Sequence, residues 1–180
     1  MKPEKSEVTR MRLLFTIDTK DYDSHGTVCS RPSARAVIIR DGKLAMMHSK
    51  KYGYYKLPGG GIKPGETPAD AMIRETAEEA GLTVIPDSIR EFGRVHRIQH
   101  GDREDVFIQD NFYFLCDAET DAGAQNLDAY ERDEGFTLCW VTPEDAIRAD
   151  LAVRDPAADL IMCLREVNVL RILMHEGLFA

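Results

Sequence analysis

The pattern of apolar and polar positions along the chain predicts a mixture of strands and helices. Apolar runs separated by turn-forming residues indicate six strands, at 8–17, 34–39, 43–48, 90–98, 106–116 and 135–141. The Asp41-Gly42 pair between the second and third strands is typical of a hairpin turn. The segments 21–32, 102–105 and 117–133 are rich in turn-forming or acidic residues, so we expect loops or turns there.

Three further segments carry helix signals. Thr67 is a suitable N-cap, Pro68 a suitable first residue and Gly81 a suitable left-handed cap, which predicts a helix over 68–80. A short helix is expected to begin at 142–144. From Pro156 onward, apolar residues recur at three- and four-residue spacing, which predicts an amphipathic helix over 156–177. Helices are thus available for both faces of a sheet, and the fold class is α/β.

The first of these helices is preceded by the run Leu57-Pro58-Gly59-Gly60-Gly61. Three successive glycines lose much backbone freedom in regular structure, and proline lacks a backbone donor. Because these glycines are followed by Ile62-Lys63-Pro64-Gly65, we expect a shaped loop at 59–65 rather than a strand or a helix.

Length and composition indicate one domain over 1–180. The chain has 180 residues, of which 43% are hydrophobic and 30% charged, without internal repeats or a linker that divides it. Within this domain, 1–30 is expected to form an N-terminal strand and loop extension, and 156–177 a C-terminal helix.

Net charge and cysteine content limit the binding partners and the cellular compartment that we expect for this protein. The 31 acidic residues outnumber the 23 Lys and Arg, giving a net charge of -8. This balance disfavours binding to nucleic acid polymers or to anionic membranes, and an anionic substrate would need a cation or a local basic patch. The four cysteines are widely separated and no stretch has the pattern of a secretory signal, so we expect a cytoplasmic protein with reduced thiols.

The predicted helix over 68–80 carries the most informative chemistry. Glu75, Glu78 and Glu79 fall on one face, and a mostly apolar arc occupies another. Like charges at this spacing repel one another, which invites a counter-charge, and carboxylate oxygens favour Mg²⁺ or Mn²⁺. The alternative is an ordinary solvated helix face, in which Arg74 and Glu78 form an i,i+4 pair.

The surrounding residues extend this helix into a longer pattern. Gly60 is followed after five residues by Glu66, and after seven more by Arg74-Glu75; Glu78-Glu79, Gly81 and Leu82 complete it. This 23-residue pattern resembles the Nudix box and fills every charged and glycine position of it. The single departure is Thr76, which stands where the family usually has an aliphatic residue.

The resemblance implies a Nudix-type α/β/α sandwich with a mixed β-sheet, and a metal-dependent pyrophosphohydrolase. Its substrate would be a nucleoside diphosphate linked to another moiety, such as a nucleoside triphosphate or related nucleotide, attacked by water at phosphorus. The cofactor would be Mg²⁺ or Mn²⁺. The resemblance further implies metal ligation by Glu75, Glu78, Glu79 and the Gly59 carbonyl, an orienting role for Arg74, and structural roles for Gly60, Glu66 and Gly81.

Residues outside the box complete the expected site. In several Nudix hydrolases a further glutamate lies a few residues before a Trp-containing strand, and Glu134 matches that position as base or extra ligand, with Glu131 and Asp133 as neighbouring alternatives. The catalytic candidates are thus Glu78, Glu134 and Arg74. Candidates for substrate contacts are Arg35, Lys50, Lys56 and Tyr54, each with the alternative of an ordinary surface or hairpin-rim residue.

Two classes of function remain open at this point. The leading hypothesis is a hydrolase of the MutT-like kind acting on a small nucleotide. The alternative is a non-catalytic Nudix-type module that binds a nucleotide as a sensor. The first strand and the last helix are candidate surfaces for a homodimer.

Overall fold

The computed structural model describes residues 11–119 and 123–179. The strands are β1 (Leu13–Asp18), β2 (Val28–Ser30), β3 (Ser33–Val37), β4 (Ile39–Arg40), β5 (Lys43–His48), β6 (Tyr55–Lys56), β7 (Gly59–Gly61), β8 (Arg90–Gln99), β9 (Val106–Leu115) and β10 (Thr137–Val141). The helices are α1 (Pro68–Ala80), α2 (Ala129–Glu134), α3 (Pro143–Ala152) and α4 (Leu160–His175), with a short 3-10 turn, η2 (Pro86–Ser88).

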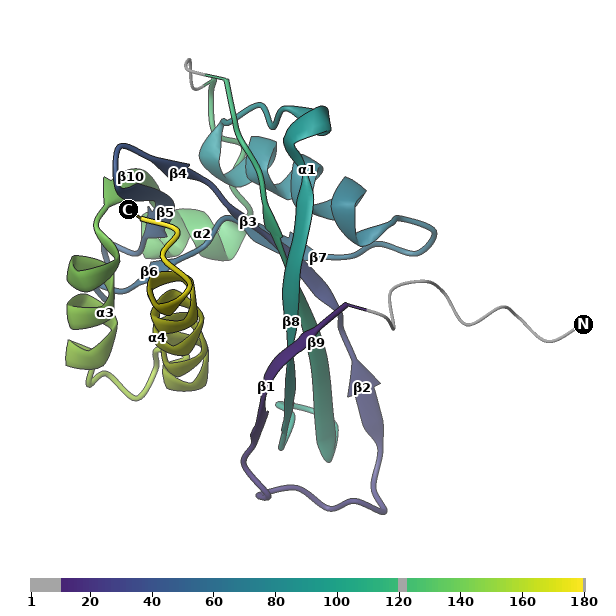
Figure 1. Cartoon of the computed structure of the whole chain (residues 1–180). Helices are drawn as coiled ribbons and strands as arrows, with labels where there is room; N and C mark the ends of the chain where they lie inside the picture. The colour runs from purple at the N-terminus through teal and green to yellow at the C-terminus, as the bar shows by residue number, and fades with distance from the viewer. Residues whose placement is uncertain (1–10, 120–122, 180) are drawn as a thin grey trace, which may run out of the picture.

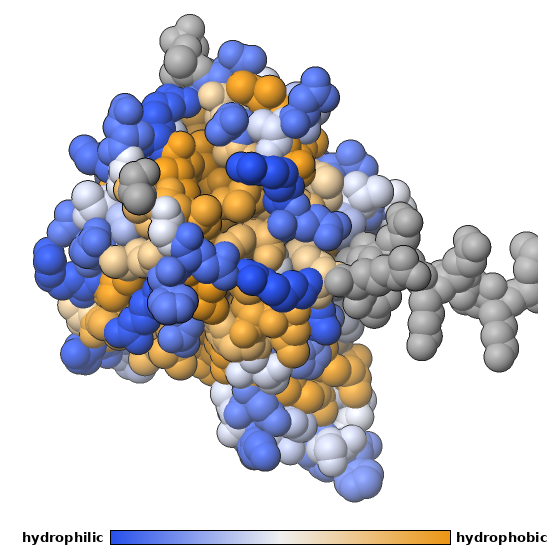
Figure 2. All heavy atoms as spheres, in the orientation of Figure 1, coloured by the Kyte–Doolittle hydropathy of each residue, from blue (hydrophilic) through white to orange (hydrophobic). Residues whose placement is uncertain are grey.

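The larger sheet is built around the antiparallel hairpin of β8 and β9. β1 pairs parallel with β8, while β2 and β3 pair parallel with β9, and β7 lies beyond β3. The far ends of β8 and β9 project from the molecule with β1 and β2 beside them (Figure 1). Hydrophilic side chains gather at the end of this projection (Figure 2). The sheet is therefore mixed, as expected.

A smaller sheet forms beside it in the strand order β10-β5-β4, with β6 also paired to β5. Asp41 and Gly42 connect β4 to β5 and both have positive φ, at 50° and 72°, which confirms the expected hairpin turn. The strand expected at 34–39 is divided at Ile38, where the chain passes from the larger sheet to the smaller one.

Helices cover the two faces of the larger sheet. α1 packs against β3 and β7, and α3 and α4 lie side by side on the opposite side of the strands (Figure 1). Successive residues of a strand point to opposite faces, so Phe112 of β9 joins the core beneath α1 with Met72, while Tyr113 joins the core beneath α4 with Leu170. This arrangement confirms the expected α/β/α sandwich.

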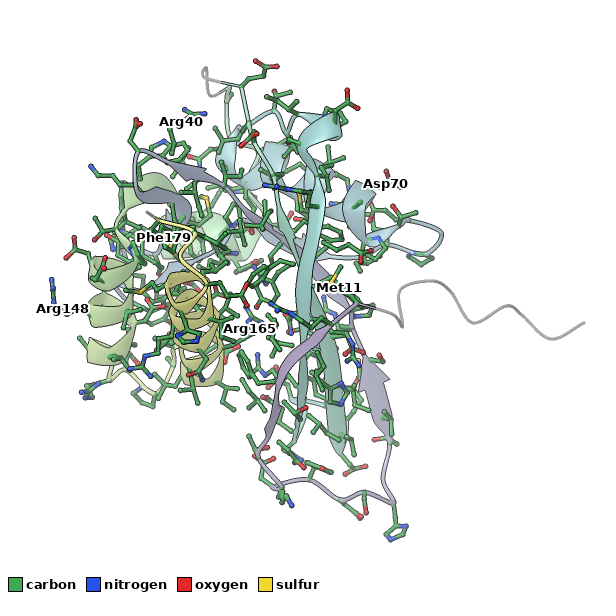
Figure 3. The ribbon with its side chains drawn as sticks, in the orientation of Figure 1. Met11, Arg40, Asp70, Arg148, Arg165 and Phe179 are labelled. Carbon is green, nitrogen blue, oxygen red and sulfur yellow. The ribbon has the colours of Figure 1, made fainter. Side chains whose placement is uncertain are left out.

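A fully buried polar pair ties α4 to the sheet and to the segment before the glycines. Arg165 points from α4 toward the strands (Figure 3), where its Nη1 donates to Oδ1 of Asn111 at 2.7 Å. Its Nη2 donates to Oε1 of Glu166 at 2.8 Å, and Oε2 of Glu166 accepts the Leu57 N–H at 3.0 Å. The backbone that leads into the glycine run is therefore anchored from α4.

Several expected boundaries were wrong. The loop expected at 59–65 begins with β7, because its three glycines pair with β3 while leaving room for a helix close by, and the rest of it is a loop. The expected loops at 21–32 and 117–133 contain β2 and the beginning of α2, respectively.

The last helix begins at Leu160 rather than Pro156, since Asp159 caps it by accepting the Met162 N–H at 2.8 Å. The first strand begins at Leu13; positions 8–10 of its expected range lie outside the described residues.

Among the described residues, no helix combines the length and apolar character needed to cross a membrane.

Candidate active site

The helix α1 has the bounds expected from its capping residues. Oγ1 of Thr67 accepts the Asp70 N–H at 3.1 Å, Pro68 occupies the first turn, and Gly81 ends the helix in the left-handed conformation with φ of 67°. Thr76, the departure from the family pattern, is completely buried on the packing face. Within the described residues its hydroxyl has no hydrogen-bond partner. Thr76 therefore packs like an aliphatic residue, but its buried, unpaired hydroxyl lowers the stability of the fold.

Arg74 is shared by three carboxylates of the box. Its Nε and Nη2 donate to the two oxygens of Glu66 at 2.7 and 2.9 Å. Its Nη1 donates to Glu75 at 2.5 Å and to Glu78 at 3.3 Å, and Nη2 also donates to the Gly61 carbonyl at 3.1 Å. The hydrogen bonds from Arg74 lower the pKa of Glu66 to about 2. Arg74 therefore holds the carboxylates of Glu66, Glu75 and Glu78 in fixed positions relative to one another.

The glycine run lets this helix approach β7 closely. A Cβ on Gly60 would lie 2.4 Å from Oε2 of Glu75, so the carboxylate of Glu75 occupies the space that a side chain would fill. A Cβ on Gly59 would lie 2.1 Å from the Ala34 carbonyl oxygen. Nη1 of Arg35 donates to the carbonyls of Leu57 and Gly59, at 3.0 and 3.1 Å, and so orients them.

Glu79 is buried at the other end of the same helix face. Its side chain is 3% exposed; Oε2 accepts the Gly59 N–H at 3.0 Å and Oε1 accepts from Nζ of Lys56 at 2.7 Å. Burial raises the pKa of Glu79 to about 7, against the lowering effect of Lys56 and with a further upward contribution from Glu131.

Lys56 is a buried cation at the centre of this region. Its Nζ lies 3.6 Å from Oε1 of Glu131, 4.5 Å from the ring centroid of Phe136 and 5.7 Å from that of Tyr130. Burial by itself lowers the pKa of Lys56, but the Glu79 carboxylate and Tyr130 together outweigh it and raise the pKa above the ordinary value. Lys56 therefore serves as a counter-charge to two buried carboxylates.

The structure separates the acidic candidates that precede the Trp-containing strand β10. Glu131 of α2 is buried beside Lys56, with Oε2 accepting the Asp128 N–H at 2.8 Å. Glu134 accepts instead from Oγ of Ser49 at 2.9 Å and from the Tyr54 hydroxyl at 2.6 Å. The Asp-x-x-Glu spacing from 128 to 131 is a capping signal that could have predicted both α2 and the inward position of Glu131.

The four candidates for substrate contacts occupy different surroundings. Arg35 and Lys56 are buried against the box, as described above, and Tyr54 is buried with its hydroxyl on Glu134. Lys50 is exposed and lies against Gly135 at the end of α2. The structure thus brings Lys56 to the Glu79 carboxylate and Arg35 to the carbonyls of the glycine run, whereas Tyr54 and Lys50 contact the end of α2.

The donor atoms suit a hard divalent cation. Carboxylates of Glu75, Glu78 and Glu79 with the Gly59 carbonyl provide oxygen ligands of the kind that Mg²⁺ prefers, and the missing side chain of Gly60 leaves space for one of them. In the described part of the chain no three acidic, His or Cys side chains already converge as a metal site. Arg74 and Lys56 instead hold the carboxylates as ion pairs.

A depression of about 980 Å³ borders the N-terminal end of the box. Phe112 and Phe114 of β9 contribute apolar surface to it, and Arg94 and Asp110 contribute polar groups. Glu66 and Thr67 form part of its rim, while Glu75, Glu78 and Glu79 do not line it. The depression is therefore adjacent to the box but separate from the three metal-ligand candidates.

Comparison with known proteins agrees with these observations. The NUDIX domain profile matches residues 30–161. An RNA pyrophosphohydrolase from Hydrogenovibrio crunogenus is 30% identical over 122 residues, which cover 62% of this chain and 73% of that protein. The nucleoside triphosphatase NudI from Salmonella schwarzengrund is 32% identical over 106 residues, which cover 56% of this chain and 70% of that protein.

Solved structures show the same fold. A NUDIX hydrolase from Nitrosomonas europaea superposes with a TM-score of 0.54 at 19% identity, covering 78% of this chain and 90% of that one. The ORF135 protein of E. coli gives a TM-score of 0.53 at 22% identity, with coverage of 83% and 94%. With the box filled, the sandwich formed and the profile matched over most of its length, the chain belongs to the Nudix hydrolase family.

Proposed function

We propose that this protein is a divalent-metal-dependent pyrophosphohydrolase that cleaves the phosphoric anhydride of a nucleoside triphosphate or a related nucleotide. The observation that carries the proposal is the arrangement of the box, in which Arg74 holds Glu75 and Glu78 together and Glu79 approaches the glycine backbone. The two relatives are named as a nucleoside triphosphatase and an RNA pyrophosphohydrolase, and both names support a phosphoric anhydride as the bond that is cleaved.

Each residue of the site would have a distinct task. Glu75, Glu78, Glu79 and the Gly59 carbonyl would hold Mg²⁺ or Mn²⁺, while Arg35 orients that carbonyl and Arg74 orients the carboxylates. When bound, the metal would neutralise the phosphate charge and activate water for attack on phosphorus. Glu78, whose side chain is 40% exposed, is the box carboxylate most open to substrate and water.

We infer that the additional carboxylate from outside the box is Glu131 rather than Glu134. Both carboxylates accept hydrogen bonds, Glu131 from the Asp128 N–H and the Tyr130 hydroxyl and Glu134 from Ser49 and Tyr54, so their positions distinguish them. Glu131 shares the Lys56 ammonium with Glu79 of the box. If Glu131 takes part in proton transfer, Glu131→Gln should lower kcat by at least about 100-fold. Glu134→Gln should change it by less than tenfold, and the reverse order of effects would reassign the role to Glu134.

The decisive test of the function is a phosphate-release assay of the full chain. Nucleoside triphosphates, ADP-ribose, sugar nucleotides and dinucleoside polyphosphates would be offered with Mg²⁺, Mn²⁺ or EDTA. We expect turnover of one class that disappears in EDTA. Folded protein that binds nucleotides without turning any of them over would support the sensor class instead.

A further inference from the structure

Lys56 occupies a place in which a protein rarely leaves a lysine. Its side chain is 7% exposed and its ammonium lies between Glu79 and Glu131, at 2.7 and 3.6 Å. The rings of Phe136 and Tyr130 approach the same ammonium. Two carboxylates and two aromatic rings therefore surround one cation, which is a strongly cation-selective environment.

Both oxygens of Glu79 already have partners in this arrangement. Oε2 accepts the Gly59 N–H and Oε1 accepts from Lys56. A divalent cation that uses Glu79 as a ligand must replace at least one of these contacts. The Gly59 contact is made by backbone of a paired strand, whereas the lysine contact is made by the end of a flexible side chain. The contact that yields is that of Lys56.

We propose that the Lys56 ammonium is a built-in counter-charge that a divalent cation displaces from Glu79, and that Lys56 thereby sets the metal affinity of the site. The proposal rests on the proposed function, since it takes Glu79 as a metal ligand. Glu131 and the two rings provide a place to which the displaced ammonium moves, so Lys56 stays in the site after the exchange.

Charge explains why metal still binds in the presence of Lys56. Glu79 and Glu131 place two carboxyl groups around one ammonium, and a divalent cation carries twice the charge of that ammonium, so the group keeps an attraction for such a cation. The ammonium opposes that attraction at short range, where repulsion between cations is strong in a buried environment. The lysine therefore weakens metal binding without preventing it.

A purely structural role for Lys56 predicts a different effect of its replacement on metal affinity. If Lys56 only stabilises buried Glu79, its replacement lowers the stability of the fold and leaves the intrinsic metal affinity unchanged or reduces it. If Lys56 competes with the metal, its replacement raises the affinity. Metal affinity thus separates the two roles without any measurement of catalysis.

The experiment measures Mn²⁺ binding to the full chain by titration calorimetry, with wild type, Lys56→Gln, Lys56→Arg and Lys43→Gln. Lys43 is exposed on β5 and provides the charge-matched control. We expect Lys56→Gln to bind Mn²⁺ at least about tenfold more tightly, with Lys56→Arg and Lys43→Gln close to wild type. Thermal unfolding should show a larger gain in Tm on adding Mg²⁺ for Lys56→Gln than for wild type. Unchanged or weaker Mn²⁺ binding by Lys56→Gln would overturn the proposal.

A measurement on wild type covers the case in which Lys56→Gln does not fold. In protein labelled with ¹⁵N at the lysine side chains, the Lys56 ammonium signal is identified by its loss in Lys56→Arg. We expect this signal to shift as Mg²⁺ is added, because the ammonium leaves Glu79. A signal unchanged at saturating Mg²⁺ contradicts the exchange. Failure of the proposed function has another signature, namely metal binding without hydrolysis of any nucleotide in the panel.

Discussion

The backbone N–H of Tyr55 donates to the buried Oδ1 of Asp150 at 2.7 Å, which joins the strand before the glycine run to helix α3. Asp150 is 4% exposed, and within the described residues its Oδ2 has no partner. Burial raises the pKa of Asp150 to about 8, in spite of the Tyr55 hydrogen bond and with a smaller contribution from Glu166.

This relationship predicts a pH-dependent stability. The folded state holds the Asp150 proton up to about pH 8, whereas the unfolded chain releases it near the ordinary aspartate pKa of 3.8. The stabilising contribution of the protonated Asp150 side chain is fully present below about pH 3.8 and is lost as the pH rises to about 8. Asp150→Asn keeps the acceptor and removes the ionisation, so its Tm relative to wild type should rise between pH 5 and pH 9. Glu144→Gln, exposed on the same helix, is the control. A difference in Tm that is independent of pH would refute the assignment.

The buried hydroxyl of Thr76 predicts a stabilising substitution. Thr76→Val keeps the shape and removes a polar atom that lacks a partner among the described residues, so the free energy of unfolding should rise by about 1 kcal/mol. Thr76→Ala leaves a cavity instead and should lower it. Urea denaturation measures both, and a loss of stability in Thr76→Val would show that the hydroxyl is hydrogen-bonded in solution.

Gly60 provides a test of the space reserved for Glu75. In Gly60→Ala the new Cβ displaces the Glu75 carboxylate, because it would lie 2.4 Å from its oxygen. Metal-dependent activity should fall by at least about tenfold, while the Tm stays near that of wild type because a flexible side chain can move. Gly61→Ala is the matched control, since its Cβ meets no atom within 4 Å. Equal activity of the two variants would argue against a precise position for Glu75.

The Arg165–Glu166 pair should be essential for stability. Arg165→Met leaves the buried Glu166 carboxylate without its cation, so the free energy of unfolding should fall by about 3–5 kcal/mol. The double variant Arg165→Met/Glu166→Gln should lose less unfolding free energy than the two single variants together, because the two residues share one hydrogen-bond network. Chemical denaturation of the three variants measures this coupling, and strictly additive losses would show that the two residues act independently.

The features that could be predicted from sequence are those whose signals are local. Thr67, Pro68 and Gly81 define α1 by themselves, and the spacing of the glutamates places them on one face of it. The partners of these glutamates are not local. Lys56 and Glu131 reach Glu79 from segments 23 and 52 residues away, and only the folding of β6 and α2 around α1 brings them together.

The glycine run shows the same limit for secondary structure. Intrinsic propensity argues against a strand in the three glycines, but pairing with β3 and the close approach of α1 make Gly59–Gly61 a strand. Likewise, the acidic composition of 117–133 favours a loop, and the reciprocal cap between Asp128 and Glu131 outweighs it. For β7 tertiary contacts decide the outcome, whereas for α2 a local capping contact does so, and composition alone reveals neither.

The two N-terminal strands have a consequence for the order of events during synthesis. Leu13 of β1 pairs with Arg94, and Val28 of β2 pairs with Val106, so both strands lie about 80 residues before their partners. During translation, these strands therefore emerge long before the hairpin that receives them and must stay unpaired meanwhile. β1 and β2, like β3, therefore join β8 and β9 in the larger sheet only after the ribosome has completed that hairpin.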